Sequence, residues 1–194
     1  MTEANSDDEL LRQMRCGQRA AFATLYQRHH AALYRYALLR CGSAANAADV
    51  VQEVFLRLLS DRLNYDSLKG ELRFYLFGVT RKLALKFDDP LTLKEPSVFD
   101  EDDEWTPEIA CDAPDPLECL FINQMAEQTR VAIAALSPHY RDVLILFEIQ
   151  ELSYLDIAEI CQINVGTVRS RLSRARYFLA QQLAHYQSVQ SRIA

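Results

Sequence analysis

The stretch SYLDIAEICQINVGTVRSRLSRARYFLA, residues 153–180, contains two helical patterns that meet at a short break. In the first pattern, apolar residues recur at helical spacing behind Ser153, whose hydroxyl is placed to cap the opening turn. The second pattern follows Asn164, which is also placed as a cap. Residues 162–164 are too few to connect anything but adjacent helices. The stretch therefore predicts a helix-turn-helix whose second helix is directed at a DNA major groove.

The second helix of this motif is rich in arginine and in small hydroxyl residues. No acidic residue follows Glu159 in the sequence, so the arginines have no local partner there. Such a helix suits contact with phosphates and base edges, whereas the alternative is a solvated surface helix. The pattern runs on to about His185, and its far end is expected to pack or to dimerise. The predicted DNA-binding residues of this helix are Thr167, Arg169, Ser170, Arg171, Ser173, Arg174 and Arg176.

The composition is that of a water-soluble globular protein, with 49% apolar and 25% charged residues. No apolar run approaches membrane-spanning length, and the start of the chain, MTEANSDDELL, is acidic where a secretory signal is basic and then apolar. We therefore expect a cytoplasmic protein without membrane insertion. The five cysteines are odd in number and lack close CxxC pairs, so neither a disulfide framework nor a zinc site is predicted.

The net charge of -6 is unevenly divided along the chain. Residues 1–86 hold thirteen Lys and Arg against nine Asp and Glu, residues 87–120 hold one against twelve, and residues 121–194 hold seven against six. The three segments thus carry +4, -11 and +1. The negative net charge of the chain comes from one acidic segment, and the other two segments are neutral to basic. The net charge therefore does not exclude nucleic acid as a partner.

The rest of the chain predicts an all-α fold of two small helical domains. Residues 1–87 form the first domain and residues 121–194 the second, which carries the helix-turn-helix. Residues 88–120 are rich in prolines and carboxylates without sustained periodicity and predict a flexible acidic linker. The clearest helix of the first domain runs from Ala45 to Leu59, with a predicted inner face of Ala48, Val51, Val54, Phe55, Leu58 and Leu59.

No motif in the sequence points to catalysis, to a cofactor or to a metal. The chain has no glycine-rich phosphate loop, no HExxH and no cysteine near a plausible base. The adjacent pair His29 and His30 is expected to be half-buried at the surface, because neighbouring side chains on a helix diverge. We therefore predict a protein that is not an enzyme.

Two stretches resemble extracytoplasmic-function (ECF) sigma factors, a group of the sigma-70 family. The sequence LSPHYRDVLILFEIQELSYLDIAEICQINVGTVRSRLSRAR, residues 136–176, is similar to region 4 of that family. ADVVQEVFLRLL, residues 48–59, is similar to region 2, and YLFGVTRKLAL, residues 75–85, to the end of region 2. VGTVRSR alone also occurs in response-regulator output domains, whereas the two motifs in this order are specific to sigma factors.

The resemblance implies a subunit that binds core RNA polymerase and promoter DNA. Region 2 of the family binds the polymerase clamp and melts the minus-10 element, and region 4 reads the minus-35 element. By position, Asp49, Gln52 and Glu53 are expected to contact the clamp, and the segment Asn64 to Arg73 to capture a flipped base. The implied DNA-binding residues of region 2 are Asn64, Lys69, Arg73, Arg81 and Lys82. Sigma factors of this type are commonly inhibited by an anti-sigma protein, so such a regulator is expected.

The chain departs from the family pattern near the expected clamp surface. Where the family often has a DAED-type run, this chain has Asn46, Ala47, Ala48 and Asp49, which removes two carboxylates. Phosphorylation of Ser43, just before this helix, is one way to restore negative charge. Lys82 also stands where asparagine is common, and Tyr75 where tryptophan is common; we expect Tyr75 to remain an aromatic core residue.

Two alternatives remain open from the sequence. The chain is also compatible with an autonomous helix-turn-helix regulator that binds DNA tightly without core polymerase, and co-elution with the polymerase discriminates the two. The carboxylates between Asp100 and Glu104 are also placed to lie against the arginines of the recognition helix and compete with DNA phosphates.

Overall fold

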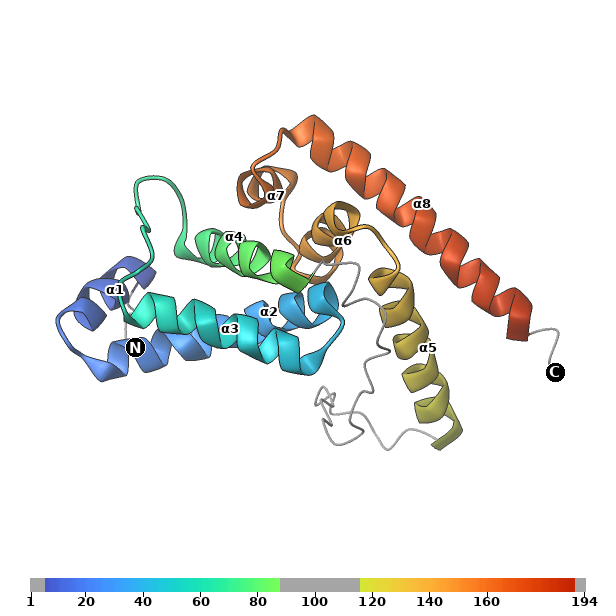
Figure 1. Cartoon of the computed structure of the whole chain (residues 1–194), viewed down its shortest axis with the longest axis horizontal. Coiled ribbons are helices and arrows are strands. Elements are labelled where there is room, and N and C mark those ends of the chain that lie inside the picture. Colours follow the sequence, from blue (N-terminus) through green and yellow to red (C-terminus); the bar gives the residue numbers. More distant parts are fainter. Residues whose placement is uncertain (1–5, 88–115, 191–194) are drawn as a thin grey trace.

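The computed structural model describes residues 6–87 and 116–190, and these residues form helices and no strand (Figure 1). The predicted all-α fold is confirmed. The first group comprises α1 (Asp7–Arg15), α2 (Arg19–Cys41), α3 (Ala44–Leu59) and α4 (Leu72–Ala84), which a 3-10 turn (Leu85–Phe87) extends. The second group comprises α5 (Pro116–Ala134), α6 (Pro138–Leu144), a π-helical segment (Ile145–Ile149), α7 (Tyr154–Cys161) and α8 (Val165–Gln190).

The break between α2 and α3 follows from two adjacent residues. Gly42 has φ +69°, a left-handed conformation that glycine adopts without steric cost, and its N–H donates to Leu38 O over 2.9 Å. Ser43 then accepts a hydrogen bond from the N–H of Asn46 and caps α3. The chain therefore turns sharply here, and α2 and α3 pack side by side.

The core of the first group lies between α2, α3 and α4. Leu25, Val50, Val54 and Leu76 are fully buried there. The predicted inner face of α3 is partly wrong, because Ala47 and Val50 are buried while Ala48 is exposed and Leu59 is 54% exposed. The helix is rotated so that its buried stripe runs through Ala47, Val50, Val51, Val54, Phe55 and Leu58.

The prediction that His29 and His30 form a half-buried surface pair is wrong for His29. His29 is only 6% exposed, and its Nε2 donates to Asp7 Oδ2 over 2.8 Å. Burial lowers the pKa of His29, against the opposing effect of the Asp7 carboxylate. His30 is partly exposed and stacks on Tyr26 with ring centroids 4.6 Å apart.

The second group begins with α5 at Pro116, near the end of the predicted linker. A proline fits the first helical turn because the N–H it lacks has no helical partner there. The helix α8 continues to Gln190, beyond the predicted end near residue 185. The acidic residues 88–115, including Asp100 to Glu104, lie outside the described residues.

The two groups are in direct contact. Helix α4 packs against α7, and α2 packs against α5, α6 and the π-helical segment, so that one buried apolar cluster includes residues of both groups. Figure 1 shows α7 above α4, with α8 as the outermost rod. The loop between α3 and α4 is thereby brought close to the helix-turn-helix. In the described parts of the chain, no helix is long and apolar enough to span a membrane.

Candidate nucleic-acid interface

The helix-turn-helix of α7 and α8 is fixed by caps at both helix starts. Ser153 and Asp156 form a reciprocal capping box, in which the Asp156 N–H donates to Ser153 Oγ and the Ser153 N–H donates to Asp156 Oδ2. Gln162 adopts a left-handed conformation, φ +54°, at the end of α7. Asn164 Oδ1 then accepts hydrogen bonds from both the N–H and the hydroxyl of Thr167, at 2.7 and 2.9 Å. These local contacts set the turn that directs α8.

The helix α8 separates apolar and basic side chains onto different faces. Val168, Leu172 and Ala175 are buried against the bundle. Arg171 is half-buried, and burial together with the positive charge of Arg171 lowers the pKa of His139. The exposed predicted DNA-binding residues of α8 are Arg169, Ser170, Ser173, Arg174 and Arg176. Five of the seven predicted DNA-binding residues of α8 are therefore exposed, whereas Thr167 and Arg171 are partly buried.

Two arginines of α8 are held by residues from other elements. The Arg169 guanidinium lies over the ring of Tyr154, 5.6 Å from its centroid. Arg176 Nε donates to Glu148 Oε1 over 2.7 Å, so this arginine has an acidic partner that is not local in the sequence. The partner precedes Glu159 in the sequence and is brought near by the packing of the π-helical segment. Both side chains of this ion pair are about half exposed, at 51% and 41%, so the pair is weak.

The loop between α3 and α4 carries the other predicted DNA-binding residues. Asn64 and Lys69 are exposed, and Lys69 forms an exposed ion pair with Asp66. Arg73 is half-buried and donates from Nη2 to the backbone oxygen of Gln150 over 3.4 Å. The loop and α4 face Glu159 and Gln162 of the helix-turn-helix across a cavity of about 270 Å³. The loop that carries Asn64 and Lys69 thus lies against α7 and the turn of the helix-turn-helix.

Arg81 and Lys82 on α4 differ in their surroundings. Lys82 is exposed, whereas the side chain of Arg81 is 20% exposed and its Nε donates to Asp142 Oδ2 over 2.7 Å. Burial opposes the charge of Arg81, but the Asp142 carboxylate outweighs burial and raises the pKa of the guanidinium. In this arrangement Arg81 is paired with the second helical group and does not face DNA.

The predicted polymerase-binding residues lie on the outer face of α3. Asp49 and Gln52 are exposed, and Glu53 is partly exposed and accepts a hydrogen bond from Arg57 Nε over 2.6 Å. Ser43, the predicted phosphorylation site, is partly exposed at the start of the same helix. The structure therefore places these residues along one helix.

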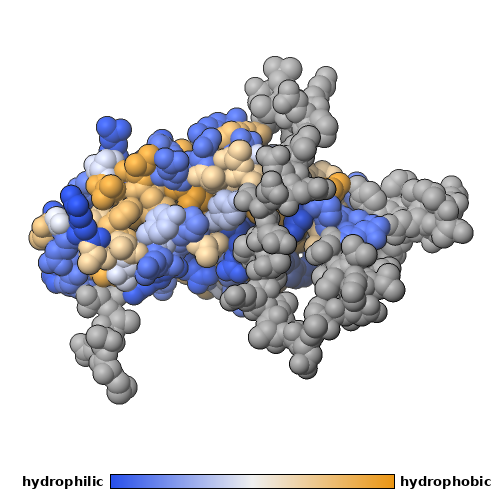
Figure 2. Space-filling view, turned by 90° about the horizontal axis from the view of Figure 1, so that it is seen from below, coloured by the Kyte–Doolittle hydropathy of each residue, from blue (hydrophilic) through white to orange (hydrophobic). Residues whose placement is uncertain are grey.

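An apolar groove next to these residues was not predicted from the sequence. It has a volume of about 450 Å³ between α2 and α3, and we call it the α2–α3 groove. Leu56 and Leu59 at its edge are 51% and 54% exposed, and Figure 2 shows apolar surface gathered on the side of the molecule formed by these helices. The sequence contains one indication of this groove: α3 has more leucines than one buried stripe accommodates, so some of them must be exposed. The groove is lined by Phe22, Tyr26, His30, Tyr34, Ala48, Val51, Gln52, Phe55, Leu56 and Leu59.

Tyr36, Arg40 and Asp142 were also missed. All three are buried, and Tyr36 and Arg40 both donate hydrogen bonds to Asp142. The sequence does contain one indication of this cluster. Leu33, Tyr36 and Arg40 recur at helical spacing, so the charged Arg40 lies on the apolar stripe of its helix. Among the described residues, no group of histidine, cysteine and acidic side chains is arranged to hold a metal ion.

Two family models match the chain. The model of Sigma-70 region 2 matches residues 25–87, and the model of Sigma-70, region 4 matches residues 126–179. The first match covers α4, most of α2, and α3, and the second covers the helix-turn-helix. Both matches therefore include the residues that carry the candidate interface.

Named relatives show the same similarity over most of the chain. The ECF RNA polymerase sigma factor SigL of Mycobacterium tuberculosis is 32% identical over 80% of this chain and 85% of that protein. SigE of Mycolicibacterium smegmatis, also an ECF RNA polymerase sigma factor, is 28% identical over 84% of this chain, which spans only 62% of the length of SigE. Among solved structures, CnrH in complex with the cytosolic domain of CnrY has a TM-score of 0.65 and 21% identity, and covers 93% of this chain and 99% of that one.

Proposed function

Because this chain belongs to the extracytoplasmic-function sigma factors of the sigma-70 family, we propose that its two helical groups direct core RNA polymerase to promoters by contacting two separate DNA elements. As an RNA polymerase sigma factor, it serves transcription initiation, and the reaction itself belongs to the core enzyme. The main observation behind the proposal that each group contacts its own DNA element is the exposed arginine face of α8. The caps at Ser153 and Asn164 set the orientation of this helix.

Region 4, which we take as residues 121–194, reads the minus-35 element in this proposal. The predicted contact set on α8 combines arginines, which pair bidentately with guanine, and serine hydroxyls, which accept or donate to bases and phosphates. The buried residues Val168, Leu172 and Ala175 hold the helix to its bundle, so the arginines approach the groove on a rigid support. This combination favours direct readout of bases over non-specific binding.

Region 2, which we take as residues 1–87, melts and captures the minus-10 element. Asn64 and Lys69 in the loop between α3 and α4 and Lys82 on α4 are exposed. Arg73 and Arg81 lie on the same helix as Lys82, but in this structure Arg73 donates to Gln150 O and Arg81 to Asp142, so both join the basic surface only when these contacts open. A single strand with flipped bases needs positive charge along its backbone and a loop that accepts a base, and this part of the molecule offers both.

The polymerase clamp binds, in our proposal, to α3 and the α2–α3 groove together. Gln52 both belongs to the predicted clamp-binding set and lines the groove. The exposed leucines offer apolar area, and the neighbouring carboxylates Asp49 and Glu53 supply charge for steering. An apolar centre with a charged rim is the usual composition of a specific protein interface.

The alternative function, an autonomous DNA-binding regulator, makes a different prediction for purified components. We expect the full chain to co-elute with core RNA polymerase on size-exclusion chromatography and to bind promoter DNA poorly without it. Tight, sequence-specific binding to duplex DNA by the free chain, with no co-elution, would support the autonomous regulator instead.

Replacing Arg171 or Arg174 by alanine tests direct readout. Each substitution is expected to cost about 1–3 kcal/mol of promoter binding by the holoenzyme and to relax the preference at one minus-35 position. Arg176, which is nearer the end of the contact set and paired with Glu148, is expected to touch phosphate, so Arg176→Ala serves as the control. Its loss should be uniform across sequences and should reduce the salt dependence. Equal, sequence-independent losses for all three variants would contradict direct readout. Binding competition with randomised minus-35 sequences measures both quantities.

A protein regulator is part of the proposal. CnrH was solved with the cytosolic domain of CnrY, and the likeness of this chain to CnrH extends over both regions. We therefore propose a partner of the anti-sigma type that binds the sigma factor and keeps it from the polymerase. Its place of action, like that of the polymerase, is the cytoplasm.

Phosphorylation of Ser43 remains a prediction, and charge variants test its premise. Asn46 and Ala48 replace family carboxylates; Asn46 is partly exposed, and Ala48 is exposed and lines the α2–α3 groove. We expect Ser43→Glu, and separately the pair Asn46→Asp with Ala48→Glu, to bind core polymerase several-fold more tightly at low salt, with the gain shrinking as salt rises. Ser60→Glu, at the negative end of α3, is the matched control and should gain less. If the pair of restored carboxylates gains nothing, the charge-deficit hypothesis fails.

A further inference from the structure

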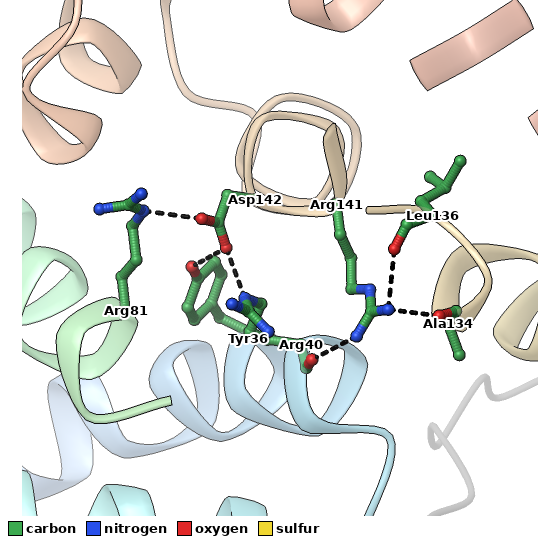
Figure 3. Close-up of polar contacts among 7 residues, drawn as sticks. All are labelled: Tyr36, Arg40, Arg81, Ala134, Leu136, Arg141 and Asp142. Atoms are coloured by element: carbon green, nitrogen blue, oxygen red, sulfur yellow. Dashed lines mark hydrogen bonds and ion pairs between the residues drawn. The ribbon is translucent and has the colours of Figure 1, made fainter. Parts of the chain in front are cut away.

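A buried carboxylate joins the two regions of this protein. Asp142, on α6 of region 4, has a side chain that is 2% exposed and points toward region 2 (Figure 3). Its Oδ1 accepts hydrogen bonds from Tyr36 Oη over 2.9 Å and from Arg40 Nε over 2.7 Å, both on α2. Its Oδ2 accepts from Arg81 Nε over 2.7 Å, on α4. One side chain of region 4 thus binds three side chains from two helices of region 2.

Neighbouring contacts hold the same interface together. Arg141 donates from Nη1 to the backbone oxygen of Arg40 over 2.8 Å, while its Nη2 donates to the oxygens of Ala134 and Leu136 within region 4 (Figure 3). Gln150 Nε2 donates to Ala32 O over 3.3 Å. The closed arrangement of the two regions is therefore a packed, hydrogen-bonded interface centred on Asp142.

This closed arrangement is incompatible with simultaneous contact to both promoter elements. The minus-10 and minus-35 elements are about 25 base pairs apart, which is about 85 Å of duplex at about 3.4 Å per step. Here the loop that is proposed to capture the minus-10 base lies next to the helix-turn-helix, and a Cβ at Gly70 would collide with the Glu159 carboxylate. The α3–α4 loop is in contact with α7, whereas the two promoter elements lie far apart, so region 4 must leave region 2 before both elements are bound.

Arg81 links closure directly to DNA binding. It belongs to the basic surface proposed for the minus-10 strand, and in the closed arrangement it is paired with Asp142. A DNA phosphate and the Asp142 carboxylate are competing anions for the same guanidinium. The loss of this pairing and the exposure of Arg81 therefore accompany opening.

We infer that Asp142 is a latch that holds the free protein closed and self-inhibited, and that binding to core polymerase and promoter DNA requires this latch to open. The inhibition of polymerase and promoter binding rests on the proposed function, but the latch itself is a property of the free chain. A buried ion pair contributes little net stability because desolvation offsets its attraction, but removing one partner is costly because the other charge is then buried without compensation. Asp142 therefore specifies how region 4 docks on region 2.

The variant Asp142→Asn tests the latch selectively. Asparagine has nearly the volume of aspartate but no charge, so in the closed state Arg40 and Arg81 lose their shared carboxylate while Arg40 stays 1% exposed. In the open state water solvates both arginines, and the substitution costs little. We expect the ratio of open to closed protein to rise by about tenfold or more. Glu127→Gln, which removes one charge from an exposed pair with Arg130 within α5, is the matched control and should change nothing.

The buried Cys161 reports opening without an added label. It is 5% exposed at the end of α7, the helix that packs against both α4 and α6. Alkylation of Cys161 by N-ethylmaleimide, followed by peptide mass spectrometry with the exposed Cys16 as internal reference, is expected to be about tenfold faster in Asp142→Asn. Small-angle scattering should show a larger radius of gyration in the same variant.

A second variant separates opening from a change in thiol chemistry. Burial raises the pKa of Cys161 to about 11, Asp142 adds to this rise, and Arg81 opposes it. Within a closed protein, Asp142→Asn would make the thiol more reactive and Arg81→Gln would make it less reactive. Opening instead accelerates alkylation in both variants, and this shared acceleration is the expected result. Opposite effects of the two variants, or unchanged scattering, would overturn the latch.

Two further measurements keep the test decisive. Circular dichroism verifies that each variant is folded; if Asp142→Asn fails to fold, Arg81→Gln, which leaves Asp142 paired with Arg40, carries the test alone. For wild type, binding to core polymerase should accelerate Cys161 alkylation, and protection that persists in the complex would refute the required opening. If the wild type binds no core polymerase, the proposed function fails, while the alkylation and scattering of the free variants still decide whether the latch exists.

Discussion

Replacing Leu59 by aspartate is expected to weaken binding of this sigma factor to core RNA polymerase by about 2 kcal/mol or more, roughly thirtyfold in Kd. Leu59 is 54% exposed at the edge of the α2–α3 groove, so its apolar surface is available to a partner. A carboxylate buried in an apolar contact must give up its water without gaining a partner, which is the physical origin of the loss. Because the free protein already exposes this position, folding should be unaffected.

The walls of the α2–α3 groove support its assignment as a docking site for an apolar element. Tyr26 and Phe55 have ring centroids 4.7 Å apart, and Phe22 meets Phe55 edge-on at 6.3 Å. These packed rings hold the groove open in the absence of a partner. A preformed apolar groove needs little reordering on binding, which favours affinity.

Leu68→Asp is the matched control for the groove variant. Leu68 also belongs to region 2 and is 93% exposed, but it lies in the loop between α3 and α4 and outside the groove. Fluorescence anisotropy of the labelled protein titrated with core polymerase, in the absence of DNA, gives both affinities. Equal losses for the two variants would show that any added carboxylate repels the polymerase, and an unchanged Leu59→Asp affinity would place the clamp elsewhere.

The sequence was sufficient to predict those features of the fold that depend on local interactions. The caps at Ser153 and Asn164 each involve residues within four positions, where propensity and hydrogen bonding act directly. The order and type of the helices followed from apolar periodicity. A stripe of apolar residues identifies which face of a helix is buried, because burial is what the periodicity reflects.

The contacts that organise the candidate site join residues that are far apart in the sequence, so local sequence patterns do not predict them. Asp142 lies in region 4, and its partners lie far away in the sequence, in region 2. Glu148 reaches Arg176 only because the π-helical segment packs near α8. The helix α3 carries apolar residues on more than one face, so periodicity alone did not separate the buried Val50 from the exposed Leu59. Long-range packing decides both which charged residues pair and which face of α3 is buried, and the sequence contains only weak signals of this packing.

Replacing Leu172 by alanine is expected to destabilise region 4 by about 3 kcal/mol, within the range of about 2–5 kcal/mol for such core truncations. Leu172 is 2% exposed on α8, on the face that packs against α6 and α7. The lost methyl groups leave a cavity under the recognition helix, and the arginines on its outer face lose their rigid support. Promoter binding should therefore fall together with stability, whereas clamp binding by region 2 should be retained.

Leu155→Ala in α7 is the control for this stability prediction, because it is the same substitution in the same helix-turn-helix at a position that is 72% exposed. It should change stability by less than about 0.5 kcal/mol. Calorimetry is expected to show the melting temperature of Leu172→Ala lowered by roughly 10 °C, since 1 kcal/mol corresponds to about 2–8 °C for units of this size. If both variants melt with the wild type, α8 does not depend on its buried stripe for position, and the rigid presentation of Arg171 and Arg174 that underlies direct readout would have to be abandoned.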